Sequence, residues 1–523
     1  MNPIEQAISA GRSAIERGDP NAARSLLSGV EHPEAAYLLA ISNTHLGLYD
    51  DAVDAYRLAL TFEPRFDQAR RTLGRLLVDL ERYEDALPEY ERVLDHEPES
   101  LPARYGYATA LLGVGRAEEA EAIFDALIDE GNDRPEIRFM RARGRLELGQ
   151  VEQGILDLEN AFERQPADYN LKSLAGTLWM RGEHDRFDAL LEQASKEPPL
   201  VAMTSELYRQ SGAPQRSVEV IESARPGGLS ADALATLSQA HADLGDAAAA
   251  EEAAREGIAV DAHHQGSIAN LIIALLMQNK AETALELVEV MRAAEPLRQH
   301  WIAYEATAWR IMGDERYAEL VDIDRFVRPY ELPVPDGFDS IDDFNAAFLE
   351  ALDHWQKYTT QPLDQSLRQG IQTTRDLTGI EDPVIEAYVR ALDTPIRAYM
   401  EAVGNSADHP LTARNTGEYR ITGSWSVRLH GGGWHVNHVH PEGWISSAYY
   451  ASVPDDVEDE SSHSGWIKFG EPPFVCEPPL EPEKWIKPKA GILVLFPSFM
   501  WHGTAPISGD STRVTAPFDV VPR

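Results

Sequence analysis

Over the first 325 residues, apolar positions recur at the spacing of a helix that buries one face. Leu38 and Ile41, and later Val53 and Tyr56, illustrate the three-residue step, which places side chains on one side of a helix. From about residue 420 the pattern changes to short alternating runs broken by glycine and proline, which is typical of β-strands. The pattern therefore predicts a helical first part and a β-rich end.

The helical part is punctuated at an interval of 34 residues. Three kinds of residue recur in register: a glycine (once replaced by Glu81), a small residue, and a proline. They stand at Gly47, Glu81, Gly115 and Gly149, at Ala52, Ala86, Ala120 and Gly154, and at Pro64, Pro98 and Pro166. Glycine permits the positive φ that ends a helix, a small residue lets two helices approach, and proline ends one unit.

This 34-residue period resembles the tetratricopeptide repeat. Later units drift by a few residues, and their glycines are Gly182, Gly212, Gly245 and Gly313. We expect about nine units across residues 1–325, stacked into a superhelix with a concave face. The resemblance implies that the array binds a protein or peptide, or joins copies of the chain into a homo-oligomer.

A proline-rich stretch, 329–335, ends the periodic part. Helical spacing returns over 341–358 and 382–404. We therefore expect a linker and flanking helices over 326–404, and the core of a β-domain over 405–523.

The β-rich end predicts six strands. Their expected ranges are 424–430, 434–440, 444–454, 465–470, 490–497 and 512–521. Several short antiparallel strands with long loops favour a sandwich or jelly roll. The expected fold class is multidomain α + β, with an N-terminal all-α solenoid and a C-terminal jelly roll with flanking helices.

Composition narrows the partners and the compartment. The formal net charge of −39 disfavours nucleic acid and anionic membranes, because the field of the chain repels phosphate. Cys476 is the single cysteine, so neither an internal disulfide nor a thiolate metal cluster can form, which fits a reducing cytoplasm. No secretory signal is visible, and the longest apolar stretch, 268–277, is too short to span a bilayer. We expect a soluble cytoplasmic protein.

The candidate chemistry lies in the segment GGGWHVNHVHPEGW. Alternate side chains of an extended segment share a face, so His438 and His440 are expected to point together and could reach one metal ion. By the same parity His435 points away. Glu442 has the parity of His440, but a turn at that point leaves its direction open.

A third ligand has to come from a distant strand. His502 follows the apolar stretch 490–497 and is the candidate. Arg513 comes eleven residues later, and Thr515 follows on the same strand face. Two close ligands, a distant histidine, an arginine and a hydroxyl residue form an ordered set, which is more specific than one histidine pair.

From about residue 340 onward the chain resembles a bacterial and phage branch of the Fe(II)- and 2-oxoglutarate-dependent oxygenases. The matching stretches are QPLDQSLRQGIQTT, GSWSVRL, HVHPEGWISSAYYASVP and GILVLFPSFMWHGTAP, followed by Arg513. The resemblance implies a double-stranded β-helix, a jelly-roll form, whose Fe(II) ligands are a histidine, a carboxylate two residues later and a distant histidine. It also implies an arginine, here Arg513, that pairs with the far carboxylate of 2-oxoglutarate.

The sequence departs from this pattern at one position, because His440 stands where the family usually has the carboxylate. We expect His438, His440 and His502 as the ligands, since the family branch shows this H-x-H-P pattern. In the alternative alignment, His440 takes the place of the first histidine and Glu442 that of the carboxylate ligand. A site of three histidines carries one negative charge less than the usual set.

Further residues are candidates for the cosubstrate pocket. Thr515 could support Arg513 in holding 2-oxoglutarate. Tyr449, Tyr450 and Ser447 follow the ligands on the strand 444–454 and could line the same pocket. The alternative for each of these three is a packed core side chain.

The resemblance thus implies a 2-oxoglutarate-dependent dioxygenase that uses Fe(II), 2-oxoglutarate and O2. We expect it to hydroxylate a protein or peptide that the repeats recruit, with the metal centre itself as the catalyst. Two alternatives stay open: a tetratricopeptide scaffold with an inactive barrel, and a cupin-type metal enzyme that does not use 2-oxoglutarate. The presence of every candidate ligand together with Arg513 counts against the scaffold, and a cupin would not need Arg513.

Overall fold

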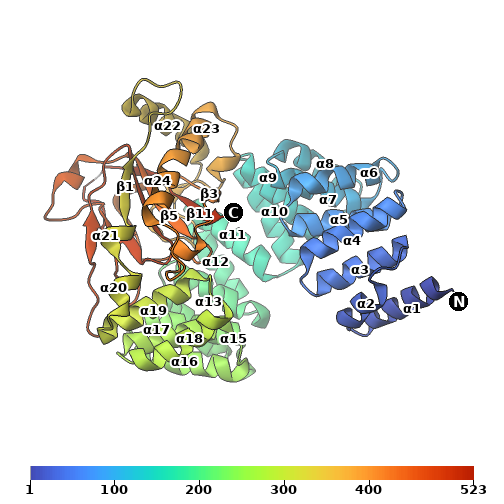
Figure 1. Cartoon of the computed structure of the whole chain (residues 1–523), viewed down its shortest axis with the longest axis horizontal. Helices are drawn as coiled ribbons and strands as arrows, with labels where there is room; N and C mark the ends of the chain where they lie inside the picture. Colours follow the sequence, from blue (N-terminus) through green and yellow to red (C-terminus); the bar gives the residue numbers. More distant parts are fainter. Residues whose placement is uncertain (1, 510) are drawn as a thin grey trace. The chain divides into compact units, whose positions relative to one another are not determined.

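Short helices joined by tight turns form the first part of the chain, as the 34-residue period predicts. The structure, a computed structural model, describes residues 2–509 and 511–523. It divides into two units, Met1–Gln165 and Pro166–Arg523. Figure 1 shows the chain coloured from blue at the N-terminus to red at the C-terminus.

The first unit is helical. Its helices are α1 (Pro3–Glu16), α2 (Pro20–Leu27), α3 (Pro33–His45), α4 (Tyr49–Phe62), α5 (Asp67–Asp79), α6 (Tyr83–Leu94), α7 (Leu101–Gly113), α8 (Ala117–Asp129), α9 (Pro135–Glu147) and α10 (Val151–Arg164). The glycine register lies in the turns between paired helices, where Gly47 and Gly115 have φ values of 73° and 78°. Glu81 occupies the same slot and takes the same left-handed conformation, with φ 57°. The turn therefore requires positive φ at this place whatever the residue.

The second unit begins with further helix pairs. They are α11 (Asp168–Met180), α12 (His184–Ala194), α13 (Val201–Gln210), α14 (Pro214–Ala224), α15 (Ala231–Asp243), α16 (Ala247–Val260), α17 (Gln265–Met277) and α18 (Ala281–Ala294). With the first unit, α1 to α18 make nine successive pairs over the described residues, in agreement with the expected number. The single helix α19 (Gln299–Met312) follows.

Five further helices of the described residues then lead into the sheet and cover it. They are α20 (Arg316–Leu320), α21 (Ile323–Phe326), α22 (Ile341–Trp355), α23 (Pro383–Ala391) and α24 (Asp393–Val403). α22 packs against β5 (Ile445–Ser452), and α24 packs against β1 (Arg328–Glu331) and β8 (Ile492–Pro497). The helices are held by a buried apolar cluster that includes Phe344, Phe348, Tyr388 and Leu495.

The β-domain consists of antiparallel strands in two sheets. The remaining strands are β2 (Leu367–Gln372), β3 (Tyr419–Ser424), β4 (Val427–His435), β6 (Ile467–Phe469), β7 (Lys484–Ile486), β9 (His502–Thr504), β10 (Arg513–Thr515) and β11 (Phe518–Pro522). The larger sheet has the order β1-β8-β5-β10-β4-β2, with β11 paired to β3 and β5. The smaller has the order β7-β6-β9. A helical solenoid-like N-terminal part followed by antiparallel sheets confirms the expected fold class, and the sheets are consistent with a jelly roll.

The strands differ from expectation at several places, of which three follow. Of the expected strand 434–440, only Trp434 and His435 are in a strand. They form the end of β4, which runs from Val427 through the glycines without a break. The expected strand 512–521 is two strands, β10 and β11, separated at Ala516 and Pro517, where proline cannot donate a ladder hydrogen bond. Strands β1 and β2 come from the segment 326–404, in which we expected only linker and helices.

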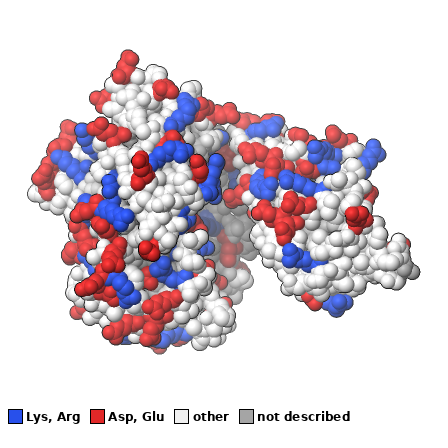
Figure 2. All heavy atoms as spheres, in the orientation of Figure 1, with Lys and Arg blue, Asp and Glu red and all other residues white. Residues whose placement is uncertain are grey.

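The surface carries the acidic excess of the sequence. Acidic side chains are spread over both units in Figure 2, with basic side chains between them. Many of these acidic and basic side chains form local ion pairs, such as those of Arg225 with Glu222 and Glu256. No helix among the described residues is long and apolar enough to cross a membrane.

Candidate metal centre

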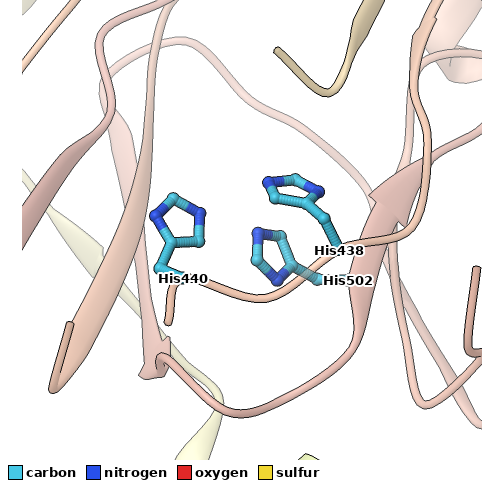
Figure 3. Close-up of side chains that lie close together, drawn as sticks. All are labelled: His438, His440 and His502. Atoms are coloured by element: carbon cyan, nitrogen blue, oxygen red, sulfur yellow. The ribbon is translucent and has the colours of Figure 1, made fainter. Parts of the chain in front are cut away.

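Three imidazole rings from two separate segments meet in the β-domain. His438 and His502 face each other across an isolated antiparallel bridge, in which each backbone N–H donates to the other residue's carbonyl oxygen. His440 lies two residues further along. One nitrogen of each ring lies within 4.8 Å of one nitrogen of each of the others. Figure 3 shows the three rings turned toward a common space.

The second nitrogen of each ring has a partner of its own. Nδ1 of His438 lies 2.9 Å from the Val436 carbonyl oxygen, and Nδ1 of His502 lies 2.9 Å from that of Met500. A carbonyl can only accept a hydrogen bond, so each Nδ1 carries the hydrogen and each Nε2 keeps a lone pair. This is the tautomer that a metal ligand requires.

His440 is oriented by a carboxylate instead. Its Nδ1 lies 2.6 Å from Oδ2 of Asp519. The other oxygen of Asp519 accepts a hydrogen bond from the Ser446 hydroxyl at 2.7 Å. The carboxylate therefore accepts from Nδ1–H and leaves Nε2 of His440 as an acceptor, as in the carboxylate–histidine pairs of metal sites.

The protein environment keeps the other two rings neutral. Burial, and then the neighbouring His440, lower the pKa of His438 to about 3. Burial, and then His438 and His440, hold the pKa of His502 well below its usual value. Both rings are neutral at pH 7, so a cation does not have to displace a proton from them.

The three rings line one end of a cavity of about 720 Å³. Arg513 lines the same cavity, with 2% of its surface exposed. One of its terminal nitrogens donates to the Gly465 carbonyl oxygen, whereas its Nε has no hydrogen-bond partner among the described residues. Burial lowers the pKa of Arg513, and the Tyr450 ring lies 5.8 Å from the guanidinium carbon.

Within residues 2–509 and 511–523, no Asp or Glu forms an ion pair with Arg513. A buried charge without a counter-ion is costly, and the fork of a guanidinium fits a carboxylate through two parallel hydrogen bonds. The three imidazole lone pairs and the unpartnered Nε of Arg513 therefore fit a divalent metal ion together with a small anionic ligand.

The structure brings the three predicted histidine ligands together with Arg513 and Thr515. His438, His440, His502, Arg513 and Thr515 all line the cavity. Ser447 lines it in part, but its hydroxyl is used inside the sheet. That hydroxyl donates to the carbonyl oxygen of Phe518 and accepts from its N–H, both at 2.8 Å.

Tyr449 does not line the cavity, so of its two possible roles the packed core side chain is the one observed. Its hydroxyl donates to the side-chain oxygen of Asn345 at 2.6 Å, on the side of the sheet that α22 covers. Side chains of β5 alternate between the two sides, so Ala448 and Tyr450 face the cavity and Tyr449 faces the core.

Glu442 and His435 also differ from expectation. The carboxylate of Glu442 forms an ion pair with Arg298 and is largely exposed. It does not join the three histidines as a ligand. His435 lines the cavity rather than pointing away. The parity argument fails there because the strand ends at His435 and the chain then turns to pair His438 with His502.

Sequence reasoning missed Asp519 and Ser366. Asp519 is the one charged residue of the otherwise apolar strand β11, a signal that could have found it. Ser366 lies beside β2, where its Oγ is 3.0 Å from Nδ1 of His435 and 3.3 Å from Nε2 of His438. No local pattern marks it, because it reaches the cavity through the pairing of β2 with β4.

Both histidine-bearing segments rest on helix α19. Next to His502, the indole N–H of Trp501 donates to the Thr307 hydroxyl at 2.9 Å. Next to His440, the carbonyl oxygen of Pro441 accepts from the Gln299 backbone N–H at 3.1 Å. The last long helix of the repeats is therefore part of the frame of this site.

Comparison with known proteins agrees with this architecture. Residues 423–519 match the family described as "Putative 2OG-Fe(II) oxygenase". Residues 8–69 and 77–144 match two tetratricopeptide repeat families. Among curated proteins, none matches the chain.

Several solved structures are similar to the repeats. A tetratricopeptide repeat protein from Parabacteroides merdae ATCC 43184 is 15% identical, with 53% of this chain and 100% of that chain covered at a TM-score of 0.35. TTC0263, a thermophilic TPR protein in Thermus thermophilus, is 25% identical, with 34% and 99% covered at 0.27. The MamA RS-1 ArsTM double mutant is 20% identical, with 31% and 94% covered at 0.30.

The family match covers the segment after β4 that carries His438 and His440, and the strands that carry His502, Arg513 and Asp519. The repeat matches cover α-helices of the first unit. The chain is thus a fusion of N-terminal tetratricopeptide repeats with a C-terminal domain of the family described as "Putative 2OG-Fe(II) oxygenase".

Proposed function

We propose that the protein is an Fe(II)- and 2-oxoglutarate-dependent dioxygenase that hydroxylates a protein or peptide. His438, His440 and His502 would hold the metal ion through Nε2, and Arg513 would hold the far carboxylate of 2-oxoglutarate. The observation that carries the proposal is the sharing of one cavity by three converging imidazoles and a buried guanidinium that has no carboxylate partner in the part of the chain that the structure describes.

Fe(II) and 2-oxoglutarate, when bound, would supply the oxidation: 2-oxoglutarate, O2 and a C–H bond give succinate, CO2 and a C–OH group. The chain's own residues bind and orient. The Val436 and Met500 carbonyls and Asp519 hold the three ring tautomers, and the walls of the cavity limit the access of water. Asp519 places a negative charge one hydrogen bond behind His440, where the family usually has a carboxylate ligand. The charge of Asp519 would offset part of the negative charge that the site lacks because its three ligands are all histidines.

Tetratricopeptide repeats mediate protein and peptide interactions through extended concave surfaces. We propose that the repeats of this chain recruit the polypeptide substrate. The support is the fusion itself and the contact of α19 with both histidine-bearing segments, which connects the array to the site of oxidation.

The function is tested by succinate formation from 2-oxoglutarate in the presence of Fe(II) and O2. The full-length protein is expected to form succinate even without substrate, at a slow uncoupled rate. Arg513→Ala should abolish this turnover, because the dicarboxylate loses its counter-ion. Arg420→Ala, at an exposed arginine on the rim of the same cavity, is the control and should retain it. If neither wild-type nor variant forms succinate, an inactive scaffold or a cupin-type enzyme is favoured.

A second prediction concerns the carboxylate behind His440. Asp519→Asn removes the charge and leaves a weaker acceptor, so the affinity for Fe(II) should fall by about 10- to 100-fold. Anaerobic metal titration measures this change. Asp393→Asn, which alters an exposed ion pair with Arg397 outside the cavity, should leave the affinity unchanged. Equal affinities for both variants would show that Asp519 does not tune the metal site.

A further inference from the structure

His435 lines the cavity next to the three converging histidines and has no role in the proposed metal set. Its ring centroid lies 6.2 Å from that of His438. Its backbone N–H donates to the Thr504 hydroxyl at 2.9 Å, and this contact fixes the end of β4. Within the described residues, Nδ1 is bonded to Ser366 and no protein group bonds Nε2.

The Ser366 hydroxyl has a single hydrogen and lies between two ring nitrogens. One is Nδ1 of His435 at 3.0 Å, and the other is Nε2 of His438 at 3.3 Å. The hydrogen of His438 is on Nδ1, which faces the Val436 carbonyl oxygen, so its Nε2 offers only a lone pair. Once that lone pair binds a metal ion, the hydroxyl hydrogen is free to be donated to Nδ1 of His435.

We infer that Ser366 donates to His435, and this direction sets the tautomer of the ring. A ring whose Nδ1 accepts a hydrogen bond carries its hydrogen on Nε2. This N–H belongs to a side chain that lines the same cavity as Arg513, whose Nε also lacks a protein partner. The cavity therefore presents two nitrogen donors of different residues, and no carboxylate of the described chain pairs with either.

We propose that His435 is a second binding residue for the 2-oxo dicarboxylate: its Nε2–H donates to an oxygen of the ligand that Arg513 holds, and Ser366 sets the tautomer. This inference rests on the proposed function and goes beyond it, because the residues involved are neither metal ligands nor the arginine. It also explains why Ser366 lies between the two rings.

The test measures binding directly, by calorimetric titration of 2-oxoglutarate into full-length protein loaded with Mn(II), which does not turn over. His435→Phe keeps a flat ring and removes the donor, so the affinity for 2-oxoglutarate should fall by about 10- to 100-fold. His435→Gln offers an amide N–H near the position of Nε2 and should restore most of the affinity. His430→Phe, at an exposed histidine of the same strand outside the cavity lining, is the matched control and should match wild type.

The affinity for Mn(II) alone separates this inference from the proposed function. All four proteins should bind Mn(II) equally, because His435 is not a ligand. Wild-type protein that binds neither Mn(II) nor 2-oxoglutarate would overturn the proposed function. Wild type and His435→Phe that bind 2-oxoglutarate equally would overturn this inference alone.

Ser366→Ala keeps the His435 ring but removes the hydroxyl that sets its tautomer. It therefore tests the same donor without the risk that His435→Phe fails to fold. Its affinity for 2-oxoglutarate should fall severalfold at unchanged Mn(II) affinity. An unchanged affinity for 2-oxoglutarate in Ser366→Ala would show that the serine does not set the donor, and would overturn its part in the proposal.

Discussion

His502→Ala is expected to lower the affinity for Fe(II) by more than about 100-fold, because loss of a ligand should exceed the 10- to 100-fold cost of losing a residue behind one. Succinate formation should disappear with it. The bridge to His438 uses backbone groups only, so alanine preserves the frame and removes the imidazole alone. Anaerobic titration with Fe(II), with the fold checked by circular dichroism, measures the effect.

The matched control is His354→Ala, at an exposed histidine of α22 outside the cavity lining. It should bind Fe(II) like wild type. A folded His502→Ala protein that binds Fe(II) as tightly as wild type would show that the three histidines do not form the metal site.

A second effect, on both stability and metal affinity, is expected in the repeats. Thr307→Val removes the hydroxyl that accepts from the Trp501 indole, and leaves a buried N–H without a partner. This costs about 1–3 kcal/mol of stability. Trp501 precedes His502, so a displacement of the Trp501 side chain should also displace the His502 ring. Metal affinity should then fall by about tenfold, a value at the low end for a residue that supports a ligand.

Two variants separate positioning from general destabilisation. Thr307→Ser keeps the hydroxyl and should restore metal affinity. Thr204→Val alters another buried threonine, on α13, whose hydroxyl has no partner among the described residues, and should leave the site unchanged. The absorption spectrum of Co(II)-loaded protein reports ligand geometry. If Thr307→Val has the wild-type spectrum and affinity, α19 does not position the histidines.

Much of the fold could be predicted because its signals are local. The 34-residue period depends on turns such as those at Gly47 and Glu81, whose positive φ is a requirement of the neighbouring residues. His502 could be found because it follows an apolar strand, and Arg513 because its spacing from His502 matches a known pattern. These residues lie in the cavity.

The errors lie where distant pairings decide the direction of a side chain. His435 was misplaced because a long-range bridge between His438 and His502 ends the strand, and no neighbouring residue indicates this bridge. Tyr449 could not be placed from the sequence, because alternation gives two faces without saying which one meets α22. The contact of Thr307 with Trp501 joins residues far apart in the sequence.

The most direct test of the central claim is an anaerobic crystal structure of the full-length protein with Mn(II) and 2-oxoglutarate. We expect one anomalous peak bound by Nε2 of His438, His440 and His502, and the Arg513 guanidinium on the far carboxylate of the ligand. A metal bound elsewhere in the chain, or a dicarboxylate that Arg513 does not touch, would contradict it.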